Sequence, residues 1–226
     1  MKENQPLRNI NRVITMKKYN KIKKILFTAI CGGLFIACQQ PHNVNDPLQV
    51  LCLGNSITKH PIKEDIEWFS DWGMAASNIE YDYCHQLEKM LCKYHPNSTV
   101  TPLNIASWER NLSCDIDSLI GSYCKNKDII IIRLGENVQD VTTFPDAISR
   151  LVKYCQSKAK RVIITGCFWK NDSKERSIIH AARTNDLTYV PLYWIDNLYN
   201  VRPQIGDTLY DLSLIHISEP TRRRGI

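Results

Sequence analysis

The chain has 226 residues and a formal charge of +6, a length that suits one well-cored domain and excludes two large ones. The positive excess lies at the two ends, because residues 38–211 carry 18 basic and 21 acidic side chains, a net charge of −3. A mildly acidic domain offers no basic groove for phosphates, so the composition does not support a nucleic-acid partner.

Residues 1–37 have the composition of a signal peptide. Five lysines between residues 17 and 24 precede an apolar run over residues 25–37, which at 13 residues is too short to span a bilayer as an ordinary helix. Residues 34–38, L-F-I-A-C, resemble the bacterial lipobox, in which the cysteine carries lipid. We therefore expect a start at Met16, export to the bacterial cell envelope, a membrane anchor on Cys38 and a tether over residues 38–46. The alternative is a plain secretory signal with an incidental cysteine.

The first predicted strand is the nearly continuous apolar run over residues 48–53, which suits a strand buried on both faces of a parallel sheet. It stops at Gly54-Asn55-Ser56, where small, turn-permissive residues replace the bulky ones. The carboxyl ends of the strands in an open α/β sheet are where ligands bind. Ser56 is therefore a candidate nucleophile, and the alternative is that these three residues form a plain strand-ending turn.

The remaining elements alternate between helix and strand. A loop over residues 59–72 contains Trp68, Phe69 and Trp72, and such aromatic side chains either form a platform for sugar rings or, more often, close the loop onto the core. Apolar spacing predicts helices over residues 73–94, 115–123 (capped by Ser113), 146–155 and 173–184. Apolar runs predict strands over residues 98–105, 128–134, 161–168 and 187–192. This alternation predicts an α/β domain over residues 47–211, with a parallel sheet of about five strands covered on both faces.

Small or polar residues follow three of these strands, in the order Gly54-Asn55-Ser56, residues 104–109 and Gly135-Glu136-Asn137. The pattern resembles the SGNH (GDSL-like) hydrolase family of serine esterases and lipases, over roughly residues 48–211. The family blocks read Gly-Asp-Ser, Asn-x-Gly-x-x-Gly and Gly-x-Asn-Asp. The chain keeps Asn104 in the second block and departs from the three blocks at Asn55, Ala106, Glu109 and Val138.

The resemblance implies the SGNH hydrolase fold, a flavodoxin-like three-layer sandwich, and a role for each block. Ser56 would attack an ester carbonyl and form an acyl-enzyme. The oxyanion would be held by the backbone N–H groups of Ser56 and Glu109 and by the side-chain amide of Asn137, with Gly54, Asn55 and Gly135 in support. A Glu109 carboxylate near the oxyanion would repel it unless it points away.

The family takes its general base from an Asp-x-x-His block near the carboxyl terminus, and neither Asp207 nor Asp211 begins one. Residues 212–222 resemble the translation of a sequencing adapter, so we expect residues 212–226 to be a non-native tail, the catalytic histidine to be missing and the chain to be nearly inactive. The alternative is a natural last strand with a basic tail. His216 lies in that tail, His180 suits a structural place in a helix, and His60 follows Ser56 by four residues in a loop.

Two functions of different classes compete. The first is a serine esterase that hydrolyses acyl esters, foremost acetyl esters, on carbohydrate such as an acylated polysaccharide. The second is a non-catalytic, glycan-binding lipoprotein on the same scaffold, which Glu109 and the missing histidine favour. A mononucleotide binder would need a glycine-rich phosphate loop, and the first turn contains Gly54 alone. None of the nine cysteines forms a C-x-x-C pair, and nothing in the sequence calls for a metal or organic cofactor.

Overall fold

The computed structural model describes residues 46–66, 68–74, 76, 78–192, 194 and 195 of the chain. Its strands are β1 (Gln49–Gly54), β2 (Thr99–Asn104), β3 (Lys127–Ile132), β4 (Ala159–Thr165) and β5 (Thr188–Val190). Its helices are α2 (Tyr83–Leu91), α3 (Ala106–Arg110), α4 (Ile116–Ile120), α5 (Phe144–Lys158) and α6 (Asp172–Thr184), with short 3₁₀ turns η1 (Glu64–Ile66) and η2 (Ile79–Tyr81). The predicted signal peptide and tail, and the tether apart from Asp46, lie outside the described residues.

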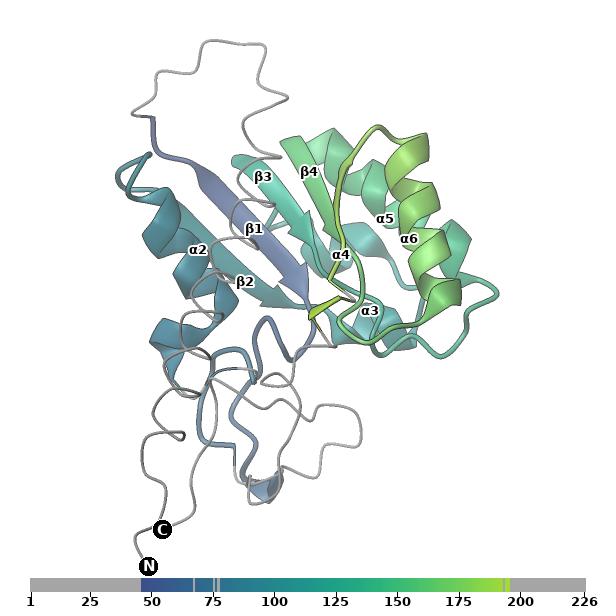
Figure 1. The fold of residues 1–226 in the computed structure, drawn as a ribbon, viewed down its shortest axis with the longest axis horizontal. Coiled ribbons are helices and arrows are strands. Elements are labelled where there is room, and N and C mark those ends of the chain that lie inside the picture. Colours follow the sequence, from purple (N-terminus) through teal and green to yellow (C-terminus); the bar gives the residue numbers. More distant parts are fainter. Residues whose placement is uncertain (1–45, 67, 75, 77, 193, 196–226) are drawn as a thin grey trace, which may run out of the picture. The chain divides into compact units, whose positions relative to one another are not determined.

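The five strands form one parallel sheet in the order β2-β1-β3-β4-β5, which confirms the predicted fold class (Figure 1). Leu53 of β1 pairs with Leu103 on one side and with Ile132 on the other. The chain leaves β1 toward β2 and later returns to the opposite side of β1 as β3, so the strand order reverses between these two strands. Open α/β sheets form their ligand-binding crevice at such a reversal, outside the carboxyl ends of the strands.

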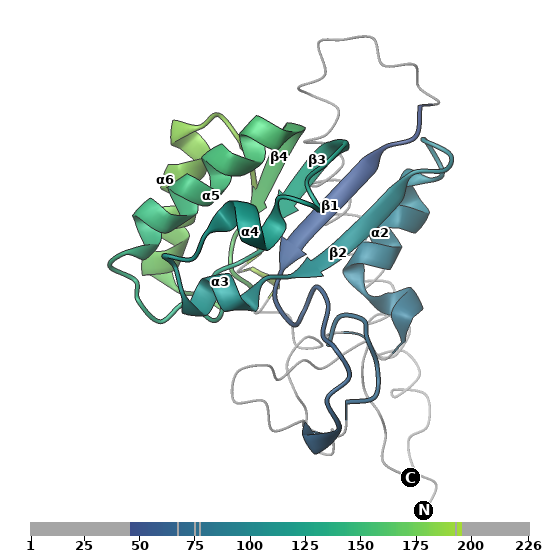
Figure 2. The same cartoon turned by 180° about the vertical axis from the view of Figure 1, so that it is seen from behind.

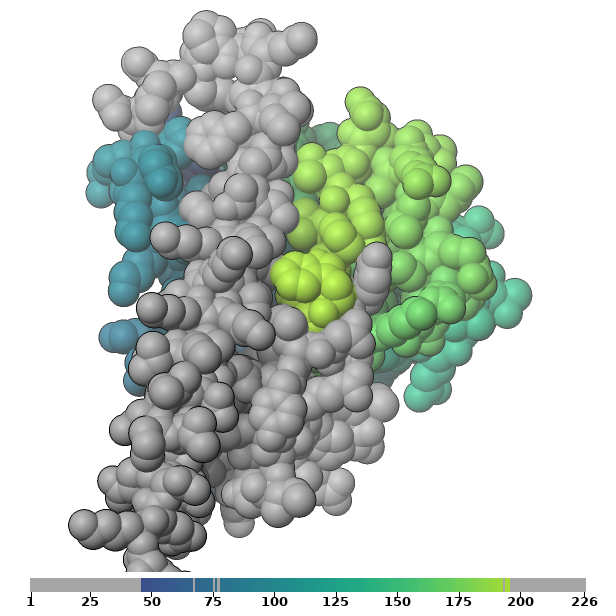
Figure 3. Space-filling model, in the orientation of Figure 1, coloured from purple at the N-terminus to yellow at the C-terminus, as the bar shows by residue number. Residues whose placement is uncertain are grey.

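Helices cover both faces of the sheet. Helix α2 lies over β1 and β2 on one face, whereas α3, α4 and α5 lie on the other, with α6 packed beside α5 (Figures 1 and 2). The space-filling view shows α2 and α6 at the surface (Figure 3). The largest buried cluster joins alternate residues of the central strands to α5, and includes Leu51, Leu53, Ile130, Ile132, Phe144, Ile148 and Leu151.

The helices differ from the prediction in three respects. The helix predicted over residues 73–94 begins only at Tyr83, because the buried carboxylate of Asp82 accepts the His85 backbone N–H at 2.8 Å and caps α2. Helix α4 is capped by Asp115 and not by Ser113, since the Asp115 side chain accepts from the N–H groups of the first turn. Helix α3 was not predicted, because five residues are too few to show a periodicity.

The described cysteines behave as small apolar residues. All seven are free thiols, and five of them are buried. No helix among the described residues is long and apolar enough to cross a membrane.

Replacing Leu151 by Ala tests the core under α5. Leu151 is fully buried, so we expect the unfolding free energy to fall by about 2–5 kcal/mol, through lost transfer energy and a residual cavity. Urea denaturation measures the change. Lys153→Ala, an exposed position of the same helix, is the control and should change the stability by less than about 0.5 kcal/mol. Equal losses in the two variants would contradict the assignment of the buried face.

Candidate active site

The turn after β1 holds Ser56, whose hydroxyl has no hydrogen-bond partner among the described residues. The Asn55 carbonyl accepts the Thr58 and Lys59 N–H groups at 2.9 and 3.1 Å, which folds the chain back sharply. A Cβ on Gly54 would lie 1.8 Å from Thr58 Oγ1, so this turn requires glycine at the strand end. Neither the Ser56 hydroxyl nor its backbone N–H makes a hydrogen bond to another described residue. A hydroxyl and an N–H free in one turn are what a nucleophile with an oxyanion donor needs.

The side chain of Asn55 ties this turn to the loop after β3. It is 1% exposed, and its Nδ2 donates to Glu136 Oε2 at 2.8 Å and more weakly to Glu109 Oε1 at 3.5 Å. Its Oδ1 accepts from Arg133 Nη1 at 3.3 Å and from the Ile57 backbone N–H at 3.2 Å. The residue next to Ser56 therefore bonds to the residue next to Asn137.

A buried ion pair that the sequence analysis missed supports Asn55. Arg133 Nη2 lies 2.9 Å from Glu136 Oε1, and the two side chains are 6% and 5% exposed. Glu136 Oε1 also accepts the Phe168 backbone N–H at 3.1 Å, which links the loop to the end of β4. An arginine directly after the isoleucines of β3 was a usable signal, because a buried cation needs a nearby carboxylate.

The side chain of Glu109 forms hydrogen bonds with the loop that carries Asn137. The residue lies in α3, is 2% exposed, and accepts the Gly135 N–H at 2.6 Å and the Asn137 N–H at 3.3 Å. Its Oε2 accepts from Asn137 Nδ2 at 2.6 Å. Burial and the charge of Glu136 raise the pKa of Glu109, while the hydrogen bonds from Asn137 and Gly135 act in the opposite direction.

The backbone N–H of Glu109 has a less favourable position. Ile105 is the N-cap of α3 and Glu109 is the fourth helical residue, a position at which the backbone N–H ordinarily bonds within the helix. Its predicted role as an oxyanion donor stays a prediction. The sequence did not predict the contacts of its carboxylate with Gly135 and Asn137.

The loop that carries Asn137 depends on a glycine. Gly135 has a φ of +135°, and a Cβ there would lie 2.5 Å from the Cys167 sulfur. This position therefore excludes other residues for both conformational and steric reasons. The conformation turns the Asn137 side chain toward α3, where Glu109 receives it.

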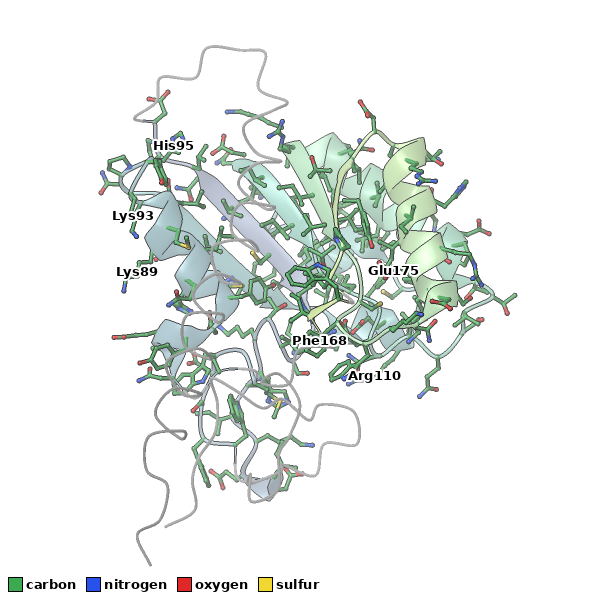
Figure 4. The ribbon with its side chains drawn as sticks, viewed as in Figure 1. Lys89, Lys93, His95, Arg110, Phe168 and Glu175 are labelled. Carbon is green, nitrogen blue, oxygen red and sulfur yellow. The ribbon has the colours of Figure 1, made fainter. Side chains whose placement is uncertain are left out.

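Among the described histidines, His60 is the one that follows β1, in the loop after the carboxyl end of the strand. Its Nδ1 lies 2.6 Å from the Pro61 carbonyl, so Nδ1 is the donor and Nε2 keeps its lone pair. Burial lowers the pKa of His60, against the effect of the Pro61 hydrogen bond. His95 lies at the opposite edge of the sheet from Phe168 and Arg110 (Figure 4), and His180 is exposed on α6.

An Asp–His pair lies at the start of α2. Asp82 Oδ2 accepts from His85 Nδ1 at 2.8 Å, and Asp82 is almost completely buried. These residues have the Asp-x-x-His spacing of the family block, at a different place in the chain. Asp82 also caps the helix, so the pair has a structural role of its own.

The aromatic loop mainly closes on itself. Trp68 is 4% exposed and packs edge-on against Trp72, with ring centroids 6.1 Å apart. Phe69 is 64% exposed, so one of the three predicted aromatics remains available to a ligand. Trp68 is thus buried within the loop, through its contacts with His60 and Trp72.

A polar cavity of about 680 Å³ lies beside α3 and the start of α5. Its lining is Glu109, Arg110, Asn111, Leu112, Ser113, Gln139, Asp140, Thr143, Asp146 and Arg150. Glu109 thus belongs both to the hydrogen-bonded network and to the wall of this cavity. Among the described residues, no cluster of His, Cys, Asp and Glu side chains could hold a metal ion.

Replacing Arg133 by Met tests the buried network. It leaves the Glu136 carboxylate buried without its cation, so we expect the unfolding free energy at neutral pH to fall by about 3–5 kcal/mol. Lys158→Met, which breaks an exposed pair with Asp117 at 3.7 Å, is the control and should cost less than about 1 kcal/mol. Similar losses in both variants would contradict the burial of the pair.

Comparison with solved structures supports the fold, whereas no protein-family model and no curated protein matches the sequence. Axe2, an acetylxylan esterase from Geobacillus stearothermophilus, is similar at a TM-score of 0.51 and 13% identity, over 78% of this chain and 90% of that one. LAE5, an alpha/beta hydrolase from the metagenome of Lake Arreo, Spain, gives 0.53 and 12%, over 76% and 88%.

AlinE4, an SGNH-hydrolase family esterase, gives a TM-score of 0.51 and 13% identity, over 73% of this chain and 86% of that one. Identities this low establish the shared architecture alone. The parallel sheet, its strand order and these similarities together show that the domain has the fold of the SGNH hydrolases.

Proposed function

We propose that this domain is a serine ester hydrolase that cleaves acyl esters, foremost acetyl esters carried by carbohydrate. The observation that carries the proposal is the Asn55 side chain, which connects the turn of Ser56 to the loop of Asn137 through Glu136 and Glu109. The turn that carries the Ser56 hydroxyl and the loop that carries the neutral Asn137 amide are thereby joined at the strand-order reversal. This is the combination that acyl transfer through a serine requires.

The proposed reaction proceeds in two steps. Ser56 Oγ attacks the ester carbonyl and passes its proton to a general base, and the carbonyl oxygen takes the negative charge. The Ser56 backbone N–H and Asn137 Nδ2 stabilise that oxygen, with the Glu109 backbone N–H as a further predicted donor. Collapse of the intermediate expels the protonated alcohol and leaves an acyl-serine. Water then attacks with the same base, releases the carboxylic acid and restores the hydroxyl.

Two observations support an acetylated carbohydrate as the substrate. Axe2 is described as an acetylxylan esterase, and a catalytic mutant of it, similar to this chain at a TM-score of 0.52, replaces a serine by alanine. The cavity beside Glu109 is lined mostly by polar and charged residues, with Leu112 as its one aliphatic residue, and such side chains can hydrogen-bond to the hydroxyl groups of a sugar.

Replacing Ser56 by Ala should abolish hydrolysis of 4-nitrophenyl acetate, by at least about 10³-fold, because the nucleophile is lost. The assay uses the uninterrupted gene product, since the sequence predicts that residues 212–226 are a non-native tail. Ser157→Ala, whose hydroxyl bonds only to the Tyr154 carbonyl in α5, is the control and should leave the rate unchanged. Retained activity in the Ser56 variant would remove this residue from the mechanism.

His60→Ala in the same background locates the base. His60 Nδ1 donates to the Pro61 carbonyl, which leaves a lone pair on Nε2, as a general base requires. A loss comparable to that of Ser56→Ala assigns the base to His60. An unchanged rate removes His60 as the base.

A glycan-binding protein without catalysis is the second candidate, and the contact between Glu109 and Asn137 favours it. The carboxylate already engages the amide at 2.6 Å, and a negative charge there opposes an oxyanion. Titration calorimetry with an acetylated xylooligosaccharide distinguishes the two functions. Binding without release of acetate, equal in the parent and in Ser56→Ala, would favour the binder.

We also propose that residues 1–37 direct export and that Cys38 carries a lipid anchor in the bacterial envelope. The support is the sequence pattern of residues 34–38. Metabolic labelling with palmitate in a bacterial host should mark the mature protein, and Cys38→Ser should abolish the label. Cys31→Ser, within the apolar run, is the control. Labelling that survives Cys38→Ser would contradict the anchor.

A further inference from the structure

Four N–H groups converge on the carboxylate of Glu109. The backbone N–H groups of Gly135 and Asn137 and the Asn55 amide donate to Oε1, at 2.6, 3.3 and 3.5 Å. Oε2 accepts from the Asn137 side chain at 2.6 Å. Every partner is a donor and none offers an acceptor for a carboxylic O–H, so this is the hydrogen-bonding pattern of an ionised carboxylate.

A carboxylate selects the orientation of the amide that it contacts. An asparagine side chain can turn either its oxygen or its nitrogen toward a neighbour, but an ionised carboxylate only accepts. Glu109 therefore requires Nδ2 of Asn137, and not Oδ1, to face α3. That contact uses one of the two N–H bonds on Nδ2 and leaves the second for another acceptor.

We propose that Glu109 is a positioning residue that holds the Asn137 amide in the orientation in which its second N–H serves as the oxyanion donor. The inference rests on the proposed hydrolysis and gives the Glu109 side chain a role of its own. This role explains how a glutamate can occupy position 109 in the second block of the proposed site. The carboxylate is held by four donors from two loops, the turn after β1 and the loop after β3, and in the proposed geometry the neutral Asn137 amide stands between it and the reacting oxygen.

The charges around Glu109 agree with this role. Glu136 is the second buried carboxylate, and its charge is paired with Arg133 at 2.9 Å. Lys174 of α6 donates to the Glu136 carbonyl at 3.2 Å and adds a second cation at this edge. Glu109 has no cation in hydrogen-bonding contact among the described residues, so its charge is stabilised by N–H groups, which also fixes their geometry.

Replacing Glu109 by Gln keeps the size of the side chain and removes the constraint. The introduced amide can donate, so Asn137 can turn its oxygen toward α3 and its Nδ2 away. We expect kcat for 4-nitrophenyl acetate to fall by about 100-fold, the loss typical of one oxyanion donor, with KM little changed. Glu109→Asp keeps a carboxylate and should recover part of the loss. Glu64→Gln, at an exposed carboxylate, is the control and should leave kcat unchanged.

Proton–nitrogen correlation spectra give a readout that does not depend on activity. In the parent protein, one side-chain N–H of Asn137 should be shifted to low field, and its signal should move with the titration of a carboxyl group. Glu109→Gln should abolish both features, and Glu109→Asp should keep the titration. If the Gln variant does not fold, the parent and the Asp variant still decide the point.

An Asn137 signal that does not titrate in the parent would overturn the proposal. So would a folded Glu109→Gln variant with an unchanged Asn137 signal and an unchanged kcat. An Asn137 signal that titrates in the parent and not in Glu109→Gln, together with full activity in Ser56→Ala, would instead retain the positioning contact and reject the proposed role of Ser56 in hydrolysis.

Discussion

The buried side chain of Asn55 is the constraint on which the site depends. Parallel pairing of β1 with β3 brings their carboxyl ends together, and the Arg133 N–H donates to the Leu53 carbonyl at 2.8 Å where the strands end. Beyond that point the backbone ladder stops. Asn55 continues the connection with its own amide, which bonds to Glu136 and Glu109 on one side and accepts from Arg133 on the other. The turn of Ser56 and the loop of Asn137 are therefore held by side chains.

Burying such a network has a desolvation cost, and its contribution is to fix the geometry of the groups in it. Two carboxylates and one guanidinium lie buried in it, and a buried ion pair seldom adds net stability over an apolar replacement. What the network provides is a fixed arrangement of donors, because its hydrogen bonds join the turn after β1, helix α3 and the loop after β3. Preorganised donors are what an oxyanion hole requires. The burial of charge at this edge is thus consistent with a site selected for precise placement.

The sequence predicted the strands well because each is a short apolar run bounded by turn residues, as residues 48–53 illustrate. It predicted Ser56 as a candidate nucleophile because the residue follows a strand, and it predicted the role of Asn137 only through a family resemblance. It did not predict α3, nor the contact between Glu109 and Asn137, because a five-residue helix decides where that carboxylate points. It also missed the pair of Arg133 and Glu136, whose partners become recognisable only when the loop after β3 folds back on the strand end.

The central claim is that the Ser56 hydroxyl and the Asn137 amide act on the same carbonyl group. A crystal structure of the protein after reaction with diethyl 4-nitrophenyl phosphate tests this most directly, because the phosphoryl oxygen occupies the place of the oxyanion. The account predicts a diethyl phosphate bound to Ser56 Oγ, with that oxygen within about 3.1 Å of Asn137 Nδ2. A phosphate on another residue, or an oxygen beyond hydrogen-bonding distance of that amide, would contradict it.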